Sequence, residues 1–276
     1  MIWNPVDGNN EDVYVTGFRR LARGPVSRSG RPLLILAAAL LLGGCGASAA
    51  GPAAPTPDPS ESVVPAETER PAHAQLAALA AAAEDRRFTG RYTLSSDGRT
   101  DRNIAVALAE DGSWRVDIQG GALSGTADVA IAQTSDGLFQ CALPAPHNQI
   151  APVCVRVGDP GGRIPAGIDP RVQHLFTSWG RVLSDRQAPL AVSPAQALPG
   201  AVGSCFSVES ISASLQPPLE VGIYCYDPDG TLTAARVAFG TLVLAGPLAA
   251  APPAITLPGP VVAGEPLRIT GPPLHS

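Results

Sequence analysis

The sequence has no lysine, a single methionine and few aromatic residues. All 19 basic residues are therefore arginine, a bias that we attribute to GC-rich coding rather than to selection for phosphate binding. The acidic residues number 24, so the net charge is −5, and no basic cluster is present that could follow a nucleic-acid backbone. The composition therefore argues against a nucleic-acid partner.

Motifs that identify common classes of enzyme are also missing. The sequence has no Gly-x-Ser-x-Gly elbow, no P-loop, no Gly-x-Gly-x-x-Gly after a strand and no His-Glu-x-x-His. His174 lies beside the apolar stripe of a predicted helix, and we interpret it as a surface or core-edge histidine rather than a general base. Neither the cysteines nor the four scattered histidines have the spacing of zinc ligands. We therefore expect no catalytic residue, no metal and no cofactor.

The first 44 residues have the order of a bacterial signal peptide. Five arginines precede an uninterrupted apolar run from Leu33 to Leu42. As a helix this run would cover about 15 Å of a hydrocarbon layer of roughly 30 Å, which is typical of a signal sequence and too short for a membrane span. The following Leu42-Gly43-Gly44-Cys45 resembles the lipobox of bacterial lipoproteins. The resemblance implies that Cys45 carries a lipid that anchors the protein to the extracytoplasmic face of the cell membrane.

Two segments flank the arginines, apolar run and lipobox: residues 1–25 before them and residues 46–72 after them. Val26 lies just ahead of the compact unit of arginines, apolar run and lipobox, so we expect translation to start at the Val26 codon and residues 1–25 to be an artefact. Residues 46–72 are rich in Ala, Pro, Ser and Glu, with almost no large apolar side chain. Such a stretch cannot bury enough surface to offset its ordering entropy. We expect residues 45–72 to form a lipid anchor and a disordered linker.

Residues 73–250 have the pattern of a helix followed by an antiparallel sheet. Residues 73–87 are good helix formers, and alternating apolar residues after them predict strands separated by Asp-Gly turns. Asp169-Pro170 predicts the start of a second amphipathic helix that continues to Leu183. Later strands are expected over residues 190–192, 205–209, 222–226 and 232–244. The Pro- and Gly-rich tail, residues 251–276, should add at most one short strand.

Four cysteines besides Cys45 form an even set in a chain with an export signal. Disulfides persist outside the cytoplasm, and four cysteines allow three pairings. We predict the pairs Cys141–Cys154 and Cys205–Cys225, because the members of each pair lie on neighbouring predicted strands joined by a short loop. Each bridge should contribute about 3 kcal/mol to stability.

Five segments carry a similarity to a known family. They are Phe88-Thr-Gly-Arg-Tyr92, Asp111-Gly-Ser-Trp114, Ser135-Asp-Gly-Leu-Phe139, Asp169-Pro170 and Tyr226-Asp-Pro-Asp-Gly230. Their order between residues 74 and 245 resembles that of lipoprotein carriers of the LolA/LolB type, which include the lipobox-anchored actinobacterial proteins LppX and LprG. The resemblance implies an α+β fold, in which an antiparallel half-open β-barrel, partly covered by helices, holds acyl chains on its concave side.

A ligand cavity on this concave side is predicted from the apolar residues that face it. We expect Phe88, Tyr92, Trp114, Val116 and Phe176 to line it. The residues themselves leave another interpretation of equal weight, in which the same side chains form the filled core of a protein that binds other envelope proteins. A hydrolase or cell-wall enzyme is a much weaker third interpretation, because no nucleophile and base can be paired in the sequence.

The lipobox can be tested by replacing its cysteine. Cys45→Ser should leave an uncleaved, unacylated precursor, because signal cleavage requires the thioether-linked diacylglycerol. Metabolic labelling with a fatty acid and the gel mobility of the protein measure the two effects. A variant that is cleaved and still partitions with membranes would contradict the lipoprotein prediction.

Overall fold

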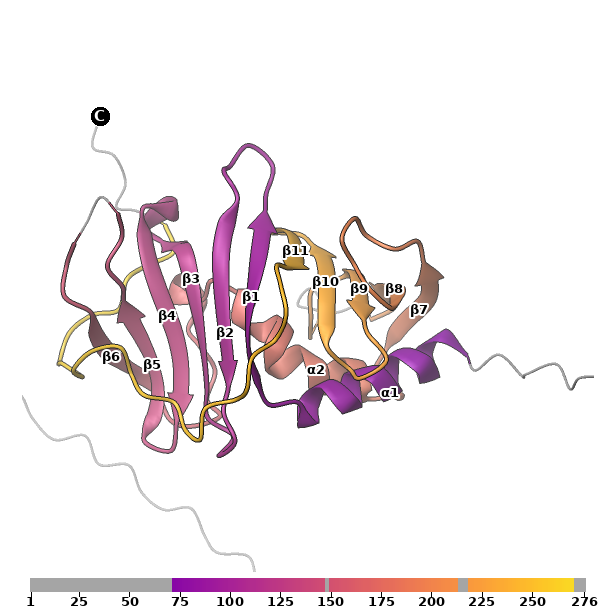
Figure 1. The fold of residues 1–276 in the computed structure, drawn as a ribbon, viewed down its shortest axis with the longest axis horizontal. Coiled ribbons are helices and arrows are strands. Elements are labelled where there is room, and N and C mark those ends of the chain that lie inside the picture. The colour runs from indigo at the N-terminus through magenta and orange to yellow at the C-terminus, as the bar shows by residue number, and fades with distance from the viewer. Residues whose placement is uncertain (1–70, 147–148, 213–217, 271–276) are drawn as a thin grey trace, which may run out of the picture. The chain divides into compact units, whose positions relative to one another are not determined.

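The computed structural model describes residues 71–146, 149–212 and 218–270. The predicted signal peptide, Cys45 and the linker up to residue 70 lie outside these residues, as does the end of the tail. The described chain forms one curved, antiparallel sheet with two α-helices (Figure 1). The α+β class and the curved antiparallel sheet are those predicted from the sequence. None of the described helices is long and apolar enough to cross a membrane.

The sheet of the described residues contains eleven strands. They are β1 Phe88–Ser95, β2 Arg102–Leu108, β3 Trp114–Ala122, β4 Ala127–Thr134, β5 Gly137–Ala142, β6 Val153–Gly158, β7 Leu190–Ala195, β8 Ser204–Ser210, β9 Gly222–Tyr226, β10 Leu232–Val237 and β11 Gly240–Leu244. Their spatial order is β6-β5-β4-β3-β2-β1-β11-β10-β9-β8-β7.

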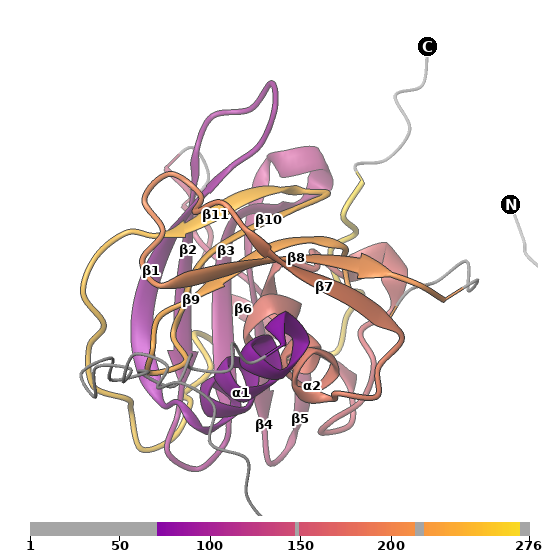
Figure 2. The same cartoon turned by 90° about the vertical axis from the view of Figure 1, so that its right-hand side faces the viewer.

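Two hairpin meanders therefore make up the sheet. Consecutive strands pair with each other within β1–β6, and they do so again within β7–β11. β11 then pairs with β1, with Tyr92 opposite Leu244 and Ser95 opposite Thr241. Strands β7–β9 run across the direction of β1–β5 in Figure 2, so the sheet is strongly twisted and curves around the helices.

The helices cover the concave face of the sheet. The α-helices are α1 Ala72–Asp85 and α2 Ser178–Ser184, and the short 3-10 helices are η1 Leu123–Gly125, η2 Ala166–Ile168 and η3 Val172–Phe176. α1 contains no Gly or Pro and is mainly alanine, which favours a helix. Its Leu76 and Ala80, one turn apart, pack into the same core as Trp179 and Leu183 of α2.

Alternation along the strands creates this core. In β1 every second residue from Phe88 to Leu94 is buried, whereas the residues between them are exposed or half-buried. The large buried residues of β2 to β5 that face the helices join them in one apolar cluster. The Tyr92 hydroxyl donates a hydrogen bond to the carbonyl oxygen of Leu232 at 3.0 Å, so the buried phenol is paired.

The predicted second helix is interrupted, so that part of the prediction is wrong. η3 and α2 are separate helices, because Thr177 between them has φ −130° and ψ −93°. Arg171 adopts a left-handed conformation with φ 69°. Asp169 caps this turn by accepting the Arg171 amide at 2.9 Å, so its side chain holds a bend rather than the first turn of a long helix.

The strand predicted over residues 232–244 is also two strands. β10 and β11 form a hairpin in which Val237 lies opposite Gly240. Gly240 has φ 141°, and a Cβ there would overlap the carbonyl oxygen of Ser95. The turn consists of Ala238 and Phe239 before Gly240, which is not a strong turn signal. The sequence therefore predicts one continuous strand here.

Residues 245–270, here called the C-terminal strap, are packed on the sheet rather than separate from it. The Cys154 amide donates to the carbonyl oxygen of Pro260, and the Val262 amide donates to that of Cys154, both at 2.9 Å. These bonds occupy the otherwise open edge of β6. The strap therefore protects one edge of the sheet from pairing with another chain.

The end of the strap reaches the concave side. The buried side chain of Gln140 donates to the Leu267 carbonyl oxygen at 2.9 Å and accepts its amide at 2.6 Å. The Leu123 amide donates to the Arg268 carbonyl oxygen at 2.8 Å. Leu257 earlier in the strap packs in a different cluster from Leu267, which joins the main core. The strap thus passes from one face of the sheet to the other around β6.

The disulfides of the structure are the two pairs predicted. Cys141 and Cys154 are directly opposite on β5 and β6, and Cys205 and Cys225 are directly opposite on β8 and β9. Each meander therefore has one bridge near its outer edge. Both bridges lie in small apolar clusters separate from the main core.

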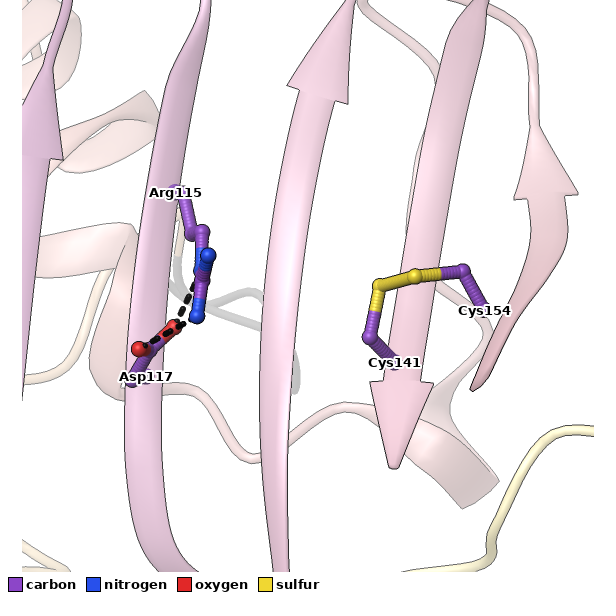
Figure 3. Close-up of a disulfide and its surroundings, with 4 residues drawn as sticks. All are labelled: Arg115, Asp117, Cys141 and Cys154. Carbon is purple, nitrogen blue, oxygen red and sulfur yellow. Dashed lines mark hydrogen bonds and ion pairs between the residues drawn. A yellow bond between two sulfur atoms is a disulfide. The ribbon is translucent and has the colours of Figure 1, made fainter. Parts of the chain in front are cut away.

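The first bridge lies on the convex face. Figure 3 shows that it projects to the same side as Arg115 and Asp117 of β3, which form an ion pair at 2.6 Å. Val116 between them is fully buried on the concave side. Leu257 of the strap packs over the cluster that contains the bridge. The convex face is therefore stabilised independently of the helices.

Two glycines of the strap provide a matched test of its importance. A Cβ on Gly259 would overlap the carbonyl group of Pro152, whereas a Cβ on Gly264 would lie at an ordinary 3.7 Å from Val155. Gly259→Ala should therefore lower the free energy of unfolding by about 1–3 kcal/mol, as for overpacking elsewhere. Gly264→Ala should leave it within about 0.5 kcal/mol of the wild type. Equal stability of the two variants in urea unfolding would contradict a structural role of the strap.

Candidate functional site

A pocket of about 790 Å³ lies at one end of the concave face. One wall consists of the starts of β1, β3 and β5 and the end of β2, and the opposite wall consists of η3 and α2. Glu84 at the end of α1 and Arg87 just after the helix add charged groups. The apolar lining includes Phe88, Leu108, Trp114, Leu138, Leu175, Phe176, Trp179, Val182 and Leu232. The charged and hydrogen-bonding lining includes Glu84, Arg87, Arg163, Asp169, His174, Ser178 and Arg181.

Three of the five residues predicted to line a cavity do so. Phe88, Trp114 and Phe176 contribute to the pocket, but Tyr92 and Val116 do not. Val116 is fully buried, and the ring of Tyr92 packs on that of Phe176 with centroids 4.8 Å apart. The four predicted residues that lie on strands share the concave face because they alternate with outward-facing residues. The middle of that face, however, is filled by side chains. The pocket lies at the end of the strands where Phe88 starts β1 and Trp114 starts β3.

A hydrogen-bonded network of three side chains borders the pocket. His174 Nδ1 lies 2.8 Å from Ser178 Oγ, and His174 Nε2 lies 2.8 Å from Asp169 Oδ2. The other carboxylate oxygen of Asp169 accepts hydrogen bonds from Gln173 Nε2 at 2.6 Å and from the Arg171 amide at 2.9 Å. The imidazole is thus held from both sides, by a carboxylate and by a hydroxyl.

The surroundings of Asp169 favour its ionised form. Burial by itself raises the pKa of the carboxyl, but the hydrogen bond and charge of His174 oppose this. The hydrogen bonds from Gln173 and the Arg171 amide add to that effect, and together they hold the pKa of Asp169 below its ordinary value. Asp169 is therefore a carboxylate at neutral pH and accepts a hydrogen bond from the imidazole N–H.

Tertiary contacts fix the segment that carries this network. Arg171 forms an ion pair with the buried side chain of Glu220, just before β9. His174 stacks on Trp179, with ring centroids 5.6 Å apart and an angle of 29° between the planes. Ser184 at the end of α2 donates to Glu84 of α1 at 2.6 Å. The segment is thus held by the loop before β9 and by α1.

Sequence reasoning did not identify the network. The sequence predicts Asp169 at the start of a helix and His174 as a surface or core-edge histidine, and no pattern in it singles out Ser178. The available signal was the four-residue spacing of His174 and Ser178, which places two side chains on one helical face. That spacing is common, and the position of the three residues beside a pocket depends on the interrupted helix.

Comparisons of the chain with protein-family models and with curated proteins find no match. The similarity to the LolA/LolB carriers therefore stays a prediction. Among the residues that the structure describes, no three His, Cys, Asp or Glu side chains are grouped so that they could hold a metal ion.

The lowered pKa of Asp169 predicts a pH-dependent contribution to stability. A carboxyl whose pKa is lowered by folding contributes its full stabilisation above the pKa of the unfolded state, which is about 3.9. This contribution is lost as the pH falls through the lower pKa of the folded state. Asp169→Asn should therefore lower the free energy of unfolding by about 1 kcal/mol at pH 6, and this difference should shrink below about pH 4. Urea unfolding at several pH values measures it, with Asp97→Asn on an exposed turn as control. A difference that stays constant down to pH 3 would contradict the assignment.

Proposed function

We propose that the protein is a cell-envelope lipoprotein, anchored to the membrane through Cys45, that binds a lipid or another hydrophobic ligand in this pocket. The anchor is supported by the lipobox and by the linker composition that follows it. The ligand is supported by the pocket, and the family resemblance points the same way.

The pocket between the sheet and η3–α2 is the observation that carries this proposal. Its volume of about 790 Å³ is within the roughly 300–1,000 Å³ that is typical of small-ligand sites. Aromatic side chains from both walls, including Phe88, Trp114 and Phe176, provide apolar contact area. Charged residues lie at the rim, so an amphipathic ligand can bury its chain and keep its polar end in water. The occupant that fits is a single acyl chain with a polar head.

A protein-interaction role is the second candidate, and a different observation favours it. The core between the sheet and the helices is filled along most of its length, with Tyr92, Val116 and Ile131 fully buried. An acyl carrier that held several chains would need more open space than one end pocket. Organic extraction of the purified full-length protein, followed by mass spectrometry, distinguishes the two roles. Recovery of a co-purifying lipid favours the ligand-binding role.

Filling the pocket should weaken ligand binding without unfolding the protein. Val182 lines the pocket from α2 and is only half-buried, so Val182→Trp can add volume without overpacking the core. The dissociation constant for a fluorescent fatty acid should rise about tenfold, which corresponds to about 1.4 kcal/mol. The melting temperature should remain that of the wild type.

Ala81→Trp is the matched control for this change. Ala81 is exposed on α1 and does not line the pocket, so the same bulk should alter neither binding nor melting. Wild-type affinity of Val182→Trp would contradict the proposed site. Failure of the wild-type protein to bind any acyl probe would favour the protein-interaction role.

A further inference from the structure

The three side chains at the rim of the pocket have an arrangement that can do chemistry. We propose that Ser178, His174 and Asp169 form a hydrolytic site that cleaves a carboxylic ester whose acyl chain occupies the pocket. The inference rests on the proposed ligand-binding function, because the apolar walls would hold the acyl chain of the substrate.

The hydrogen bonds assign a role to each group. When Asp169 Oδ2 accepts a hydrogen bond from the N–H at His174 Nε2, the lone pair of Nδ1 faces the hydroxyl of Ser178. Both distances are 2.8 Å. A base that is oriented by a carboxylate and contacts a hydroxyl is the arrangement that activates serine nucleophiles in unrelated folds. Asp169 contacts no substrate in this scheme and is a positioning residue. Its second oxygen is held by Gln173 and the Arg171 amide, so the carboxylate cannot easily turn away.

Ser178 is placed where a substrate carbonyl could reach it. Ser178 is exposed and lines the pocket, and the next residue, Trp179, belongs to the apolar wall. A chain bound against that wall would place its ester at the rim. Arg181, three residues further along α2, also lines the pocket, and its guanidinium forms no ion pair within the described part of the chain. A cation one turn from the nucleophile can stabilise negative charge on the carbonyl oxygen.

The reaction needs only water as co-reactant. Ser178 Oγ attacks the ester carbonyl carbon while its proton passes to His174 Nδ1. The bond from this carbon to the alcohol oxygen then breaks, and the alcohol leaves with the proton from His174. Water attacks the acyl-serine and gives a proton to His174 Nδ1. The acyl–Oγ bond breaks, the carboxylic acid leaves and the proton returns to Ser178 Oγ.

The same contacts could instead serve only to fasten η3 to α2, and the two roles differ in reactivity. A structural serine does not react with a fluorophosphonate, whereas an activated one forms a covalent adduct. Full-length wild-type protein in detergent should therefore be modified by a fluorophosphonate probe at Ser178, as mapped by peptide mass spectrometry. It should also release p-nitrophenol from p-nitrophenyl octanoate faster than from the acetate, because the longer chain reaches the apolar wall.

Variants separate the nucleophile, the base and the positioning residue. Ser178→Ala and His174→Ala should each lower the octanoate rate at least about 100-fold. Ser193→Ala is the matched control, because this serine is exposed on β7 and does not line the pocket. It should retain the wild-type rate. Asp169→Asn should lower kcat and leave KM unchanged, which a general loosening of the pocket would not do.

The outcomes distinguish this inference from the proposed ligand binding. If the wild type binds a fluorescent fatty acid but Ser178 takes up no fluorophosphonate, the hydrolytic site is overturned and ligand binding stands. If Ser178 is modified and the acetate is hydrolysed but no acyl probe binds, the acyl pocket is overturned and the nucleophile stands. Adduct formation at another residue, or equal rates for the wild type and Ser178→Ala, also overturns the inference. The adduct on the wild type decides the question even if a variant does not fold.

Discussion

The pairing of β1 with β11 is the constraint on which the rest of the structure depends. It joins the first strand of the domain to the last and converts two separate meanders into one sheet. The apolar faces of both meanders then form one concave surface, and α1 and α2 can bury both halves together. Because these strands are far apart in the sequence, forming the contact costs a substantial loop-closure entropy. Burial of Tyr92, Leu94 and Leu242 at this seam offsets that cost.

The outer parts of the sheet lie far from this seam and are stabilised in other ways. Each meander has a disulfide between neighbouring strands near its outer edge, within an apolar cluster on the face away from the helices. The C-terminal strap occupies the edge of β6 and then crosses to the concave side, where it meets Gln140. Alanine and glycine are abundant in this chain, so covalent and backbone contacts supply part of the stability that larger side chains supply in other proteins.

The small number of large apolar side chains also explains where the pocket lies. The middle of the concave face is filled by the aliphatic and aromatic residues that the chain has, and the helices leave space at one end. The interruption at Thr177 turns η3 and α2 so that both apolar and polar groups border this space. An apolar wall beside an oriented Ser178–His174–Asp169 network is an arrangement suited to an amphipathic ligand, and it links the proposed binding function to the proposed chemistry.

By itself the sequence determined the features that depend on local pattern. The two-residue period of the apolar side chains identified most strands and their buried face, and the short spacing of the cysteines on neighbouring strands identified both disulfides. Only the tertiary structure decided the break at Thr177, the path of the strap and the grouping of Asp169, His174 and Ser178 beside a pocket. It also decided that Phe88 borders open space while Val116, with the same alternation, is in the filled core. Periodicity determines which face a side chain occupies, but the packing of helices from distant parts of the chain determines where along that face a space is left.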